Sequence, residues 1–316
     1  MLRRSIILPT LAAAAFTALF ILVGWPRINP FGFPDLDNYR VGFQSGWYLF
    51  TTLDREPIDF VLNEGLWVYL FDFMYALIGD IDDTFTFVSI VIVFLTSLYV
   101  VLRAQAPWYL LFFFNPAFIE IALGQIRSGL AAGLFWTAVN VKGLPFKLAL
   151  LLAASAIHTS FVLFSLIYLV FHFLRDTRSA DAALSNSALT VLVISALALV
   201  PTVFREAALS TIGDQRAYQF LEYSSGIFLA IGWASFFVTY LLLRSDRRIS
   251  FEGFFYGFGA AAALFSAIVG VYGARLVSIA IPALAVMCFQ IDPRYRVLFI
   301  GQFIGFSGLY FVYWLS

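Results

Sequence analysis

The stretch FNPAFIEIALGQIRSGLAAGLFWTAVN (residues 114–140) carries one arginine, Arg127, between two apolar segments. A guanidinium in such surroundings costs several kcal/mol of lost hydration unless an anion pairs with it. Arginine cannot lose its proton to escape this cost, and its planar fork matches a carboxylate or a phosphate. The stretch therefore predicts membrane helices with a functional anion site at Arg127, where the anion comes from the protein or from a substrate.

The whole chain shares this apolar character. Its 316 residues are 62% hydrophobic, 19% aromatic and only 12% charged, and the mean hydropathy is +0.90. Soluble domains have a charged fraction of about 25%. We therefore predict an all-α polytopic membrane protein, and since no internal repeat, linker or soluble domain is visible, a single domain over residues 1–316.

Charge and metal-ligating residues exclude several classes of function. The formal net charge is zero and no block of like charge occurs, so we expect no nucleic-acid partner. Cys288 is the single cysteine, and His158 and His172 are the two histidines. A zinc site of the usual His/Cys kind is therefore not expected, and neither is a cofactor.

Roughly ten or eleven segments have the apolar character of a membrane segment, for which about 20 residues make one span. The first, Ser5–Trp25, is long for a signal peptide and lacks a small-residue cleavage site, so we expect a retained helix with a cytoplasmic N-terminus. The others lie near residues 64–79, 85–102, 107–124, 128–141, 147–174, 187–204, 227–243, 251–271, 276–290 and 297–314.

Two topologies fit the distribution of positive charge. Arginines within residues 175–178, 244–248 and 294–296 are predicted to face the cytoplasm, which simple alternation satisfies. Alternation also puts Arg127 near the cytoplasmic face. In the second topology, residues 64–79 lie in the interface, and residues 147–174 enter and return as two half-helices that break near His158.

Polar residues gather in two long stretches between the apolar segments. Residues 26–64 contain Asp35, Asp37 and Tyr39, and residues 205–224 contain Arg216. Carboxylates and aromatic rings suit the sugar of a sugar phosphate, whereas arginines suit the phosphates. The alternative is that these stretches are solvated loops with ordinary surface ion pairs.

Four polar residues lie in apolar segments or at their edges, and each has a structural alternative to a functional role. Arg127 could pair with Glu120 two turns earlier, and Arg275 could be an interfacial residue whose charge reaches water. His158 could bond to a neighbouring helix, and Glu64 could favour the N-terminal dipole of the helix that it precedes.

Several of these residues fall in motifs that resemble the Wzy-type bacterial polysaccharide polymerases, especially their EpsG-like branch. Residues 35–39 (DLDNY) resemble the family's Asp-Tyr-x-Asn-Tyr element, and Glu64-Gly65 is similar to its Glu-Gly element. Residues 125–131 (QIRSGLA) resemble its Gln-Ile-Arg-Gln-Gly-x-Ala, with Ser128 in place of Gln. Residues 158–160 (HTS) resemble its His-x-Ser, and Arg275 resembles a late arginine. The resemblance covers residues 30–170 best.

The resemblance implies a metal-independent glycosyltransferase of the all-helical GT-C kind in the bacterial inner membrane. Such an O-antigen, exopolysaccharide or capsule polymerase transfers a glycan from undecaprenyl diphosphate to a lipid-linked repeat unit at the periplasmic face, in some cases with a chain-length regulator. The implied diphosphate-binding residues are Arg127, Arg275 and Arg216. The implied catalytic residues are Glu64 and His158, then Asp37, and the implied sugar-binding residues are Asp35 and Tyr39.

Three other functions remain open on sequence grounds. A lipid-linked glycan ligase shares the donor but transfers to another acceptor. A membrane O-acyltransferase would use His158, yet acyl transfer gives no reason to bury Arg127 or Arg275. A transporter with a charged site at mid-membrane is the non-enzymatic alternative, although many such folds show repeated halves.

Overall fold

The protein is helical throughout the residues that its computed structural model describes, which are 4–29, 32–46, 60, 64–174, 186–202, 226–269 and 274–316. Within these ranges the only β feature is an isolated bridge between Arg244 and Ile291. The prediction of an all-α polytopic membrane protein is therefore confirmed. The chain divides into two compact units, of which the first comprises residues 1–110 and 119–169 and the second residues 111–118 and 170–314.

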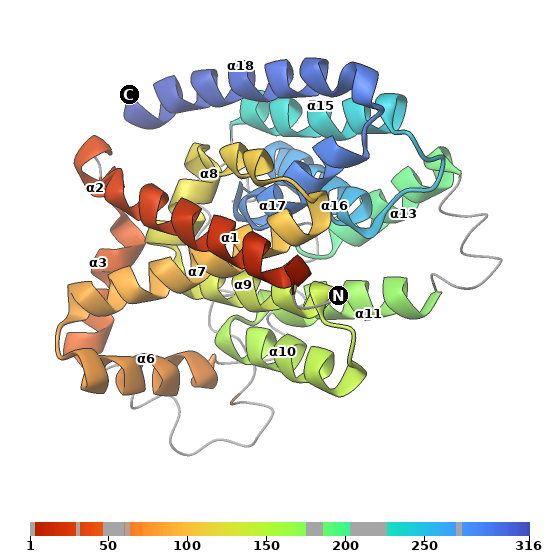
Figure 1. Ribbon diagram of the computed structural model, residues 1–316. Helices are drawn as coiled ribbons and strands as arrows, with labels where there is room; N and C mark the ends of the chain where they lie inside the picture. The colour runs from red at the N-terminus through yellow and green to blue at the C-terminus, as the bar shows by residue number, and fades with distance from the viewer. Residues whose placement is uncertain are drawn as a thin grey trace. The chain divides into compact units, whose positions relative to one another are not determined.

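The first unit contains the N-terminal helices (Figure 1). In chain order these are α1 (Arg4–Leu22), α2 (Trp25–Ile28), α3 (Pro34–Gln44), α6 (Gly65–Ile78), α7 (Ile81–Ala104), the π-helical turn η2 (Glu120–Gly124), α9 (Ile126–Asn140), α10 (Leu144–Ile157) and α11 (Ser160–Leu174), whose last residues belong to the second unit. Two further short elements are η1 (Pro107–Phe113) and α8 (Pro116–Ile119). They include residues 111–118, which belong to the second unit although the residues before and after them belong to the first.

Helix α7 is the centre of the first unit, with α1 and α9 packed along it (Figure 1). Glycines let α9 approach its neighbours closely. A Cβ atom at Gly129 would lie 2.3 Å from the carbonyl oxygen of Ile121 and 2.8 Å from Cδ1 of Ile92, and one at Gly133 would lie 3.3 Å from Leu95. Small residues on α9 thus set the spacing to α7 and η2, as small residues do where helices pack in membranes.

The second unit is arranged around α16 (Phe251–Val269), which packs against three other helices. These are α13 (Ser187–Leu199), α15 (Ile227–Leu243) and α17 (Ala274–Gln290), and the unit ends with η4 (Pro293–Tyr295) and α18 (Arg296–Leu315). Arg296 stabilises the C-terminal end of α17, because its guanidinium donates to the carbonyl oxygens of Phe289 and Ile291 at 2.6 and 3.1 Å.

A buried polar network joins α15, α16 and α17 in the second unit. Glu252, only 1% exposed, accepts a hydrogen bond from Nε2 of Gln290 at 3.2 Å. The Oε1 atom of Gln290 in turn accepts from Tyr240 at 3.2 Å and from Ser250 at 2.7 Å. Since each of these groups has a partner, the network explains the buried carboxylate of Glu252 as part of the packing.

Four helical segments in the described part of the chain are long and apolar enough to cross a membrane: Ile6–Ile28, Ile81–Ala104, Phe251–Val269 and Pro293–Leu315. Six other apolar helices have 10–17 residues, fewer than the roughly 20 that cross a bilayer in a straight helix. Most of the ten or eleven segments expected from hydropathy therefore form shorter helices.

Two of the expected segments are broken. Residues 107–124 bend by 84° at Asn115-Pro116, where the Asn115 side chain accepts from the backbone of Ala117 at 2.9 Å and donates to Ser307 at 2.8 Å. Residues 147–174 form two helices, because α10 ends at Ile157 and α11 begins at Ser160. The break near His158 that the second topology requires is thus present.

Candidate functional site

Glu64 occupies an unusual backbone position immediately before α6. Its φ of 63° and ψ of 33° lie in the left-handed region, which non-glycine residues adopt rarely and at a cost of about 1–3 kcal/mol. The next residue has to be small, since a Cβ atom at Gly65 would lie 2.3 Å from the ring of Phe60. The Glu64-Gly65 pair therefore sets the direction in which the Glu64 side chain, 6% exposed, leaves the backbone.

Arg127 is the ion-pair partner of Glu64. It is the second residue of α9, directly after the π-helical turn η2, and its Nη1 atom lies 2.5 Å from Oε2 of Glu64. The Arg127 side chain is 22% exposed, so the guanidinium keeps access to its surroundings while the carboxylate is buried. Glu64 is 63 residues away from Arg127 in the chain, and the sequence analysis did not name it as a partner.

The break between α10 and α11 brings His158 to the same carboxylate. His158 is extended, with φ −147° and ψ 117°, and its Nδ1 atom lies 3.3 Å from Oε1 of Glu64. The backbone N–H of Thr159 donates to the same oxygen at 3.4 Å, and the Ser160 hydroxyl lies 3.2 Å from Nδ1 of His158. Glu64 thus contacts groups from two separate parts of the chain.

Tyr39 completes the described cluster from α3. Its ring lies under the Arg127 guanidinium, with the Cζ atom 5.5 Å from the ring centroid, which is a cation–π distance. Asp35 precedes Tyr39 by four residues on α3, so the two side chains share one face of that helix. We call Tyr39, Glu64, Arg127 and His158 the Glu64 cluster.

The N-terminus of α9 adds backbone donors beside Arg127. The first N–H groups of a helix have no partner within the helix, and the N-cap residue here, Gln125, makes no side-chain hydrogen bond to them. Its Oε1 atom is buried without a hydrogen-bond partner among the described residues. Together, a guanidinium and an uncapped helix N-terminus form a suitable environment for an anion.

Asp37 is engaged in a different contact. It forms an ion pair with Arg40 at 2.5 Å, and Arg40 also binds Asp82 at the start of α7 at 2.5 Å. The hydrogen bond that Arg40 donates to the Asp82 carboxylate is the largest effect on the pKa of Arg40, and it raises that pKa. Since the Asp37 side chain is 72% exposed, its described contacts connect α3 to α7 at the surface.

The two remaining predicted arginines are Arg275 and Arg216. Arg275 is the second residue of α17, in the second unit. Arg216 lies outside the described residues.

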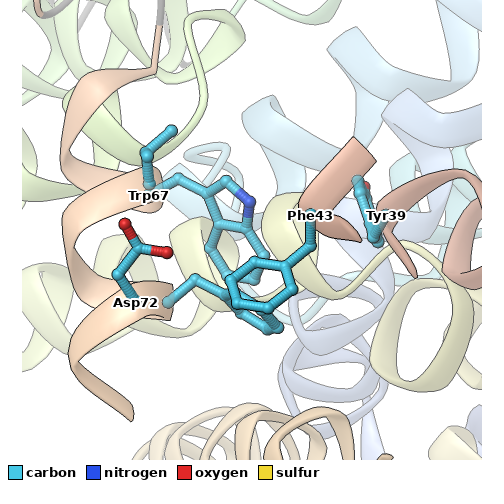
Figure 2. A pocket seen from close by; sticks show the side chains of 6 residues that line it. Tyr39, Phe43, Trp67 and Asp72 are labelled. Atoms are coloured by element: carbon cyan, nitrogen blue, oxygen red, sulfur yellow. The ribbon is translucent and has the colours of Figure 1, made fainter. Parts of the chain in front are cut away.

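One further polar residue, Asp72, was missed by the sequence reasoning. It lies on α6 and lines a pocket with Tyr39, Phe43, Trp67, Val68 and Phe71, as Figure 2 shows. The signal was present, because Asp72 is the only charged residue within residues 65–78. A carboxylate on an otherwise apolar helix is a functional candidate by the same reasoning that selected Arg127.

Comparison with known proteins identifies no relative of the chain. No protein-family model, no curated protein and no solved structure matches the chain significantly.

Proposed function

We propose that the protein is a polysaccharide polymerase that transfers a glycan from a polyprenyl diphosphate to a sugar hydroxyl of the next lipid-linked repeat unit. The observation that carries the proposal is the ion pair of the partly exposed Arg127 with the buried carboxylate of Glu64, with His158 on the same carboxylate. Such a reaction needs a cation for the departing diphosphate and a base for the acceptor hydroxyl, and this cluster offers both.

Arg127 is the diphosphate-binding residue in this proposal. Its guanidinium carries a permanent positive charge on a planar fork of N–H donors that matches a phosphate, and the Arg127 side chain is 22% exposed. The N-terminal N–H groups of α9 point toward the same end of the helix and favour an anion there. As the bond between the anomeric carbon and the diphosphate breaks, the negative charge that develops on the leaving oxygen is stabilised by these fixed donors.

His158 is the base, and Glu64 positions it. For this role His158 carries its proton on Nδ1 and donates it to Oε1 of Glu64, in place of the 3.4 Å hydrogen bond that Nδ1 accepts from the Ser160 backbone N–H, and Nε2 becomes the acceptor. The acceptor hydroxyl oxygen then bonds to the anomeric carbon while its proton moves to Nε2 of His158. The carboxylate stabilises the imidazolium that forms, and the diphosphate leaves with the electrons of the broken bond.

Glycan analysis of a strain without this gene tests the proposal. Surface and lipid-linked glycans are separated as ladders from the deletion strain and from strains that carry wild-type protein or variants. We expect deletion and Arg127→Ala to abolish polymer, with a single repeat unit retained on its carrier and a normal amount of the variant in the membrane. Arg127→Lys should restore little, because the planar fork is lost, whereas Asp83→Asn, an exposed carboxylate on α7, should behave as wild type.

The same ladders separate the other functions. Full-length polymer that stays on the lipid carrier indicates a ligase, unchanged chain length with lost acyl groups indicates an acyltransferase, and an unaltered glycan indicates transport. Normal polymer in Arg127→Ala would remove Arg127 from the mechanism.

The division of roles between His158 and Glu64 requires kinetics with purified protein. His158→Gln should lower kcat by about 100-fold or more with little change in KM, as expected for loss of a general base. Glu64→Gln should also lower kcat, but by less than His158→Gln, because the base remains and only its orientation is lost. A larger loss in Glu64→Gln than in His158→Gln would make the carboxylate itself the base.

A further inference from the structure

Two loops of the second unit hold each other in place. Residues 244–250 connect α15 to α16, and residues 291–295 connect α17 to α18; we call them the paired loops. An antiparallel bridge joins them, and beside it the backbone N–H of Ser245 donates to the carbonyl oxygen of Gln290 at 3.1 Å. Side chains on both loops are therefore presented from a fixed backbone.

The paired loops carry more positive than negative charge. Their charged residues are four arginines and two aspartates: Arg244, Arg247, Arg248, Arg294, Asp246 and Asp292. Oδ1 of Asp246 accepts from the backbone N–H of Arg248 at 3.0 Å. Oδ1 of Asp292 accepts from that of Arg294, also at 3.0 Å. Within the described ranges neither aspartate forms an ion pair, so the carboxylates stabilise turns and leave the arginines for other anions.

Two of the arginines are accessible to a ligand. Arg247 and Arg294 are exposed, and in the part of the chain that the structure describes no hydrogen bond, ion pair or ring contact engages either guanidinium. Arg244 is held more firmly, because its Nη2 atom donates to the Ser187 hydroxyl at 3.0 Å and to the Arg247 carbonyl oxygen at 2.5 Å. The loops thus combine one anchored arginine with two that are free to bind.

The helices that leave the paired loops have an apolar outer surface. Helices α15 and α18 lie side by side (Figure 1), and the rings of Phe236 and Phe299 join them with centroids 5.5 Å apart. Leu242 at the end of α15 is 77% exposed, and Val297 at the start of α18 is 75% exposed. Only 17% of the candidate span Pro293–Leu315 is buried within the protein. In a bilayer this surface faces acyl chains, and the arginines lie at its polar end.

We propose that the paired loops bind the headgroup of an anionic phospholipid, with Arg247 and Arg294 donating to its phosphate and its acyl chains lying along α15 and α18. A guanidinium fork matches a phosphate, and arginines next to a membrane helix attract anionic headgroups. The charge pattern of the sequence also predicts that both loops face the cytoplasm, where the leaflet carries a negative surface potential. The inference concerns lipid binding and is independent of the proposed function.

An acidic segment of another protein is the competing ligand for a surface rich in arginine. Such a segment satisfies the guanidinium groups but gives no role to the exposed apolar side chains beside them. A phospholipid covers both, because its headgroup and acyl chains are joined in one molecule. The described surface therefore favours the lipid.

Native mass spectrometry of the full chain, released from detergent micelles at low ionic strength, tests the inference. The probes are dioleoyl-phosphatidylglycerol, dioleoyl-phosphatidylcholine, which has the same chains and phosphate but no net charge, and inorganic phosphate. We expect wild-type protein to bind phosphatidylglycerol at least about tenfold more tightly than phosphatidylcholine. Arg247→Gln and Arg294→Gln should each weaken phosphatidylglycerol binding by about fivefold, the effect of one arginine near an anionic lipid surface.

Arg27→Gln is the matched control. Arg27 is also an exposed arginine, and it lies at the end of another candidate span, Ile6–Ile28. This variant loses the same charge, and its phosphatidylglycerol affinity should stay within about twofold of wild type. Since Arg247 and Arg294 make no side-chain contact with the described residues, both glutamine variants are expected to fold, and their thermal unfolding midpoints should equal that of wild type.

Three results would overturn the inference. Wild-type protein that binds both lipids equally would leave the loops to an acidic protein partner. A preference for phosphatidylglycerol that persists when Arg247 and Arg294 are both replaced by glutamine would place the lipid elsewhere. Displacement of phosphatidylglycerol by an equal concentration of inorganic phosphate would make the loops a site for a free anion.

Discussion

The ion pair between Glu64 and Arg127 should contribute measurably to stability, and a double-mutant cycle gives its size. The N–O distance is 2.5 Å, and the side chains are 6% and 22% exposed. Coupling between contacting residues is about 0.5–3 kcal/mol. Burial of the carboxylate places this pair toward the upper end, and the partial exposure of the guanidinium reduces the value, because water screens it. We therefore expect a coupling of about 2 kcal/mol, or roughly a 30-fold change in the unfolding equilibrium.

The cycle compares Glu64→Gln, Arg127→Gln and the double variant. Unfolding is followed by tryptophan fluorescence during titration with SDS in mixed micelles. Each single variant leaves a charge without its partner in a largely buried site. The loss in the free energy of unfolding in each single variant should therefore exceed half of the loss in the double variant.

A surface pair is the matched control. Asp37 and Arg40 are also 2.5 Å apart, yet their side chains are 72% and 34% exposed. The cycle of Asp37→Asn and Arg40→Gln should therefore give no more than about 0.5 kcal/mol. If the effects of Glu64→Gln and Arg127→Gln add to within about 0.5 kcal/mol, the pair contributes no more than an exposed one, and the reasoning from its burial is refuted.

Three further predictions concern packing and capping, all measured as thermal unfolding midpoints in detergent. Gly129→Ala should destabilise by about 1–3 kcal/mol because a Cβ atom has no space there, whereas Gly301→Ala, with nothing within 4 Å, should be neutral or slightly stabilising; equal midpoints would contradict this. Asp80→Ala removes the side-chain cap of α7 and should cost about 1 kcal/mol, a loss that Asp80→Asn should largely avoid. Asn115→Ala removes its buried hydrogen bond with Ser307 and should cost about 1–3 kcal/mol, and an unchanged midpoint would mean that this bond contributes nothing.

Local patterns predicted much of the fold and part of the candidate site. Apolar composition alone predicted helices, because backbone groups in lipid must bond within their own segment. The expectation that Arg127 has an anionic partner is met by Glu64, and the break near His158 is where α10 ends. Each of these follows from the chemistry of one residue and its immediate neighbours.

Features that depend on contacts between distant segments could not be predicted. Glu120 and Glu64 are both carboxylates in apolar surroundings, and only the packing of the folded chain brings Glu64 to Arg127. Hydropathy windows also join short helices into longer ones, as in residues 107–124, because composition does not report a bend. Asp72 was missed for a related reason, since its significance comes from the aromatic rings that α3 brings to it.

The close approach of α9 to α7 has an evolutionary consequence. Gly129 leaves no space for a side chain against Ile92, and Gly133 is almost as close to Leu95. A larger residue at Gly133 requires a smaller one at position 95, so substitutions at these two positions should be inherited together. In an alignment of homologues, positions 95 and 133 should therefore covary in size, with their summed volume held nearly constant, whereas position 129 should stay glycine whatever residue stands at position 92, because a Cβ atom there also meets the backbone of Ile121.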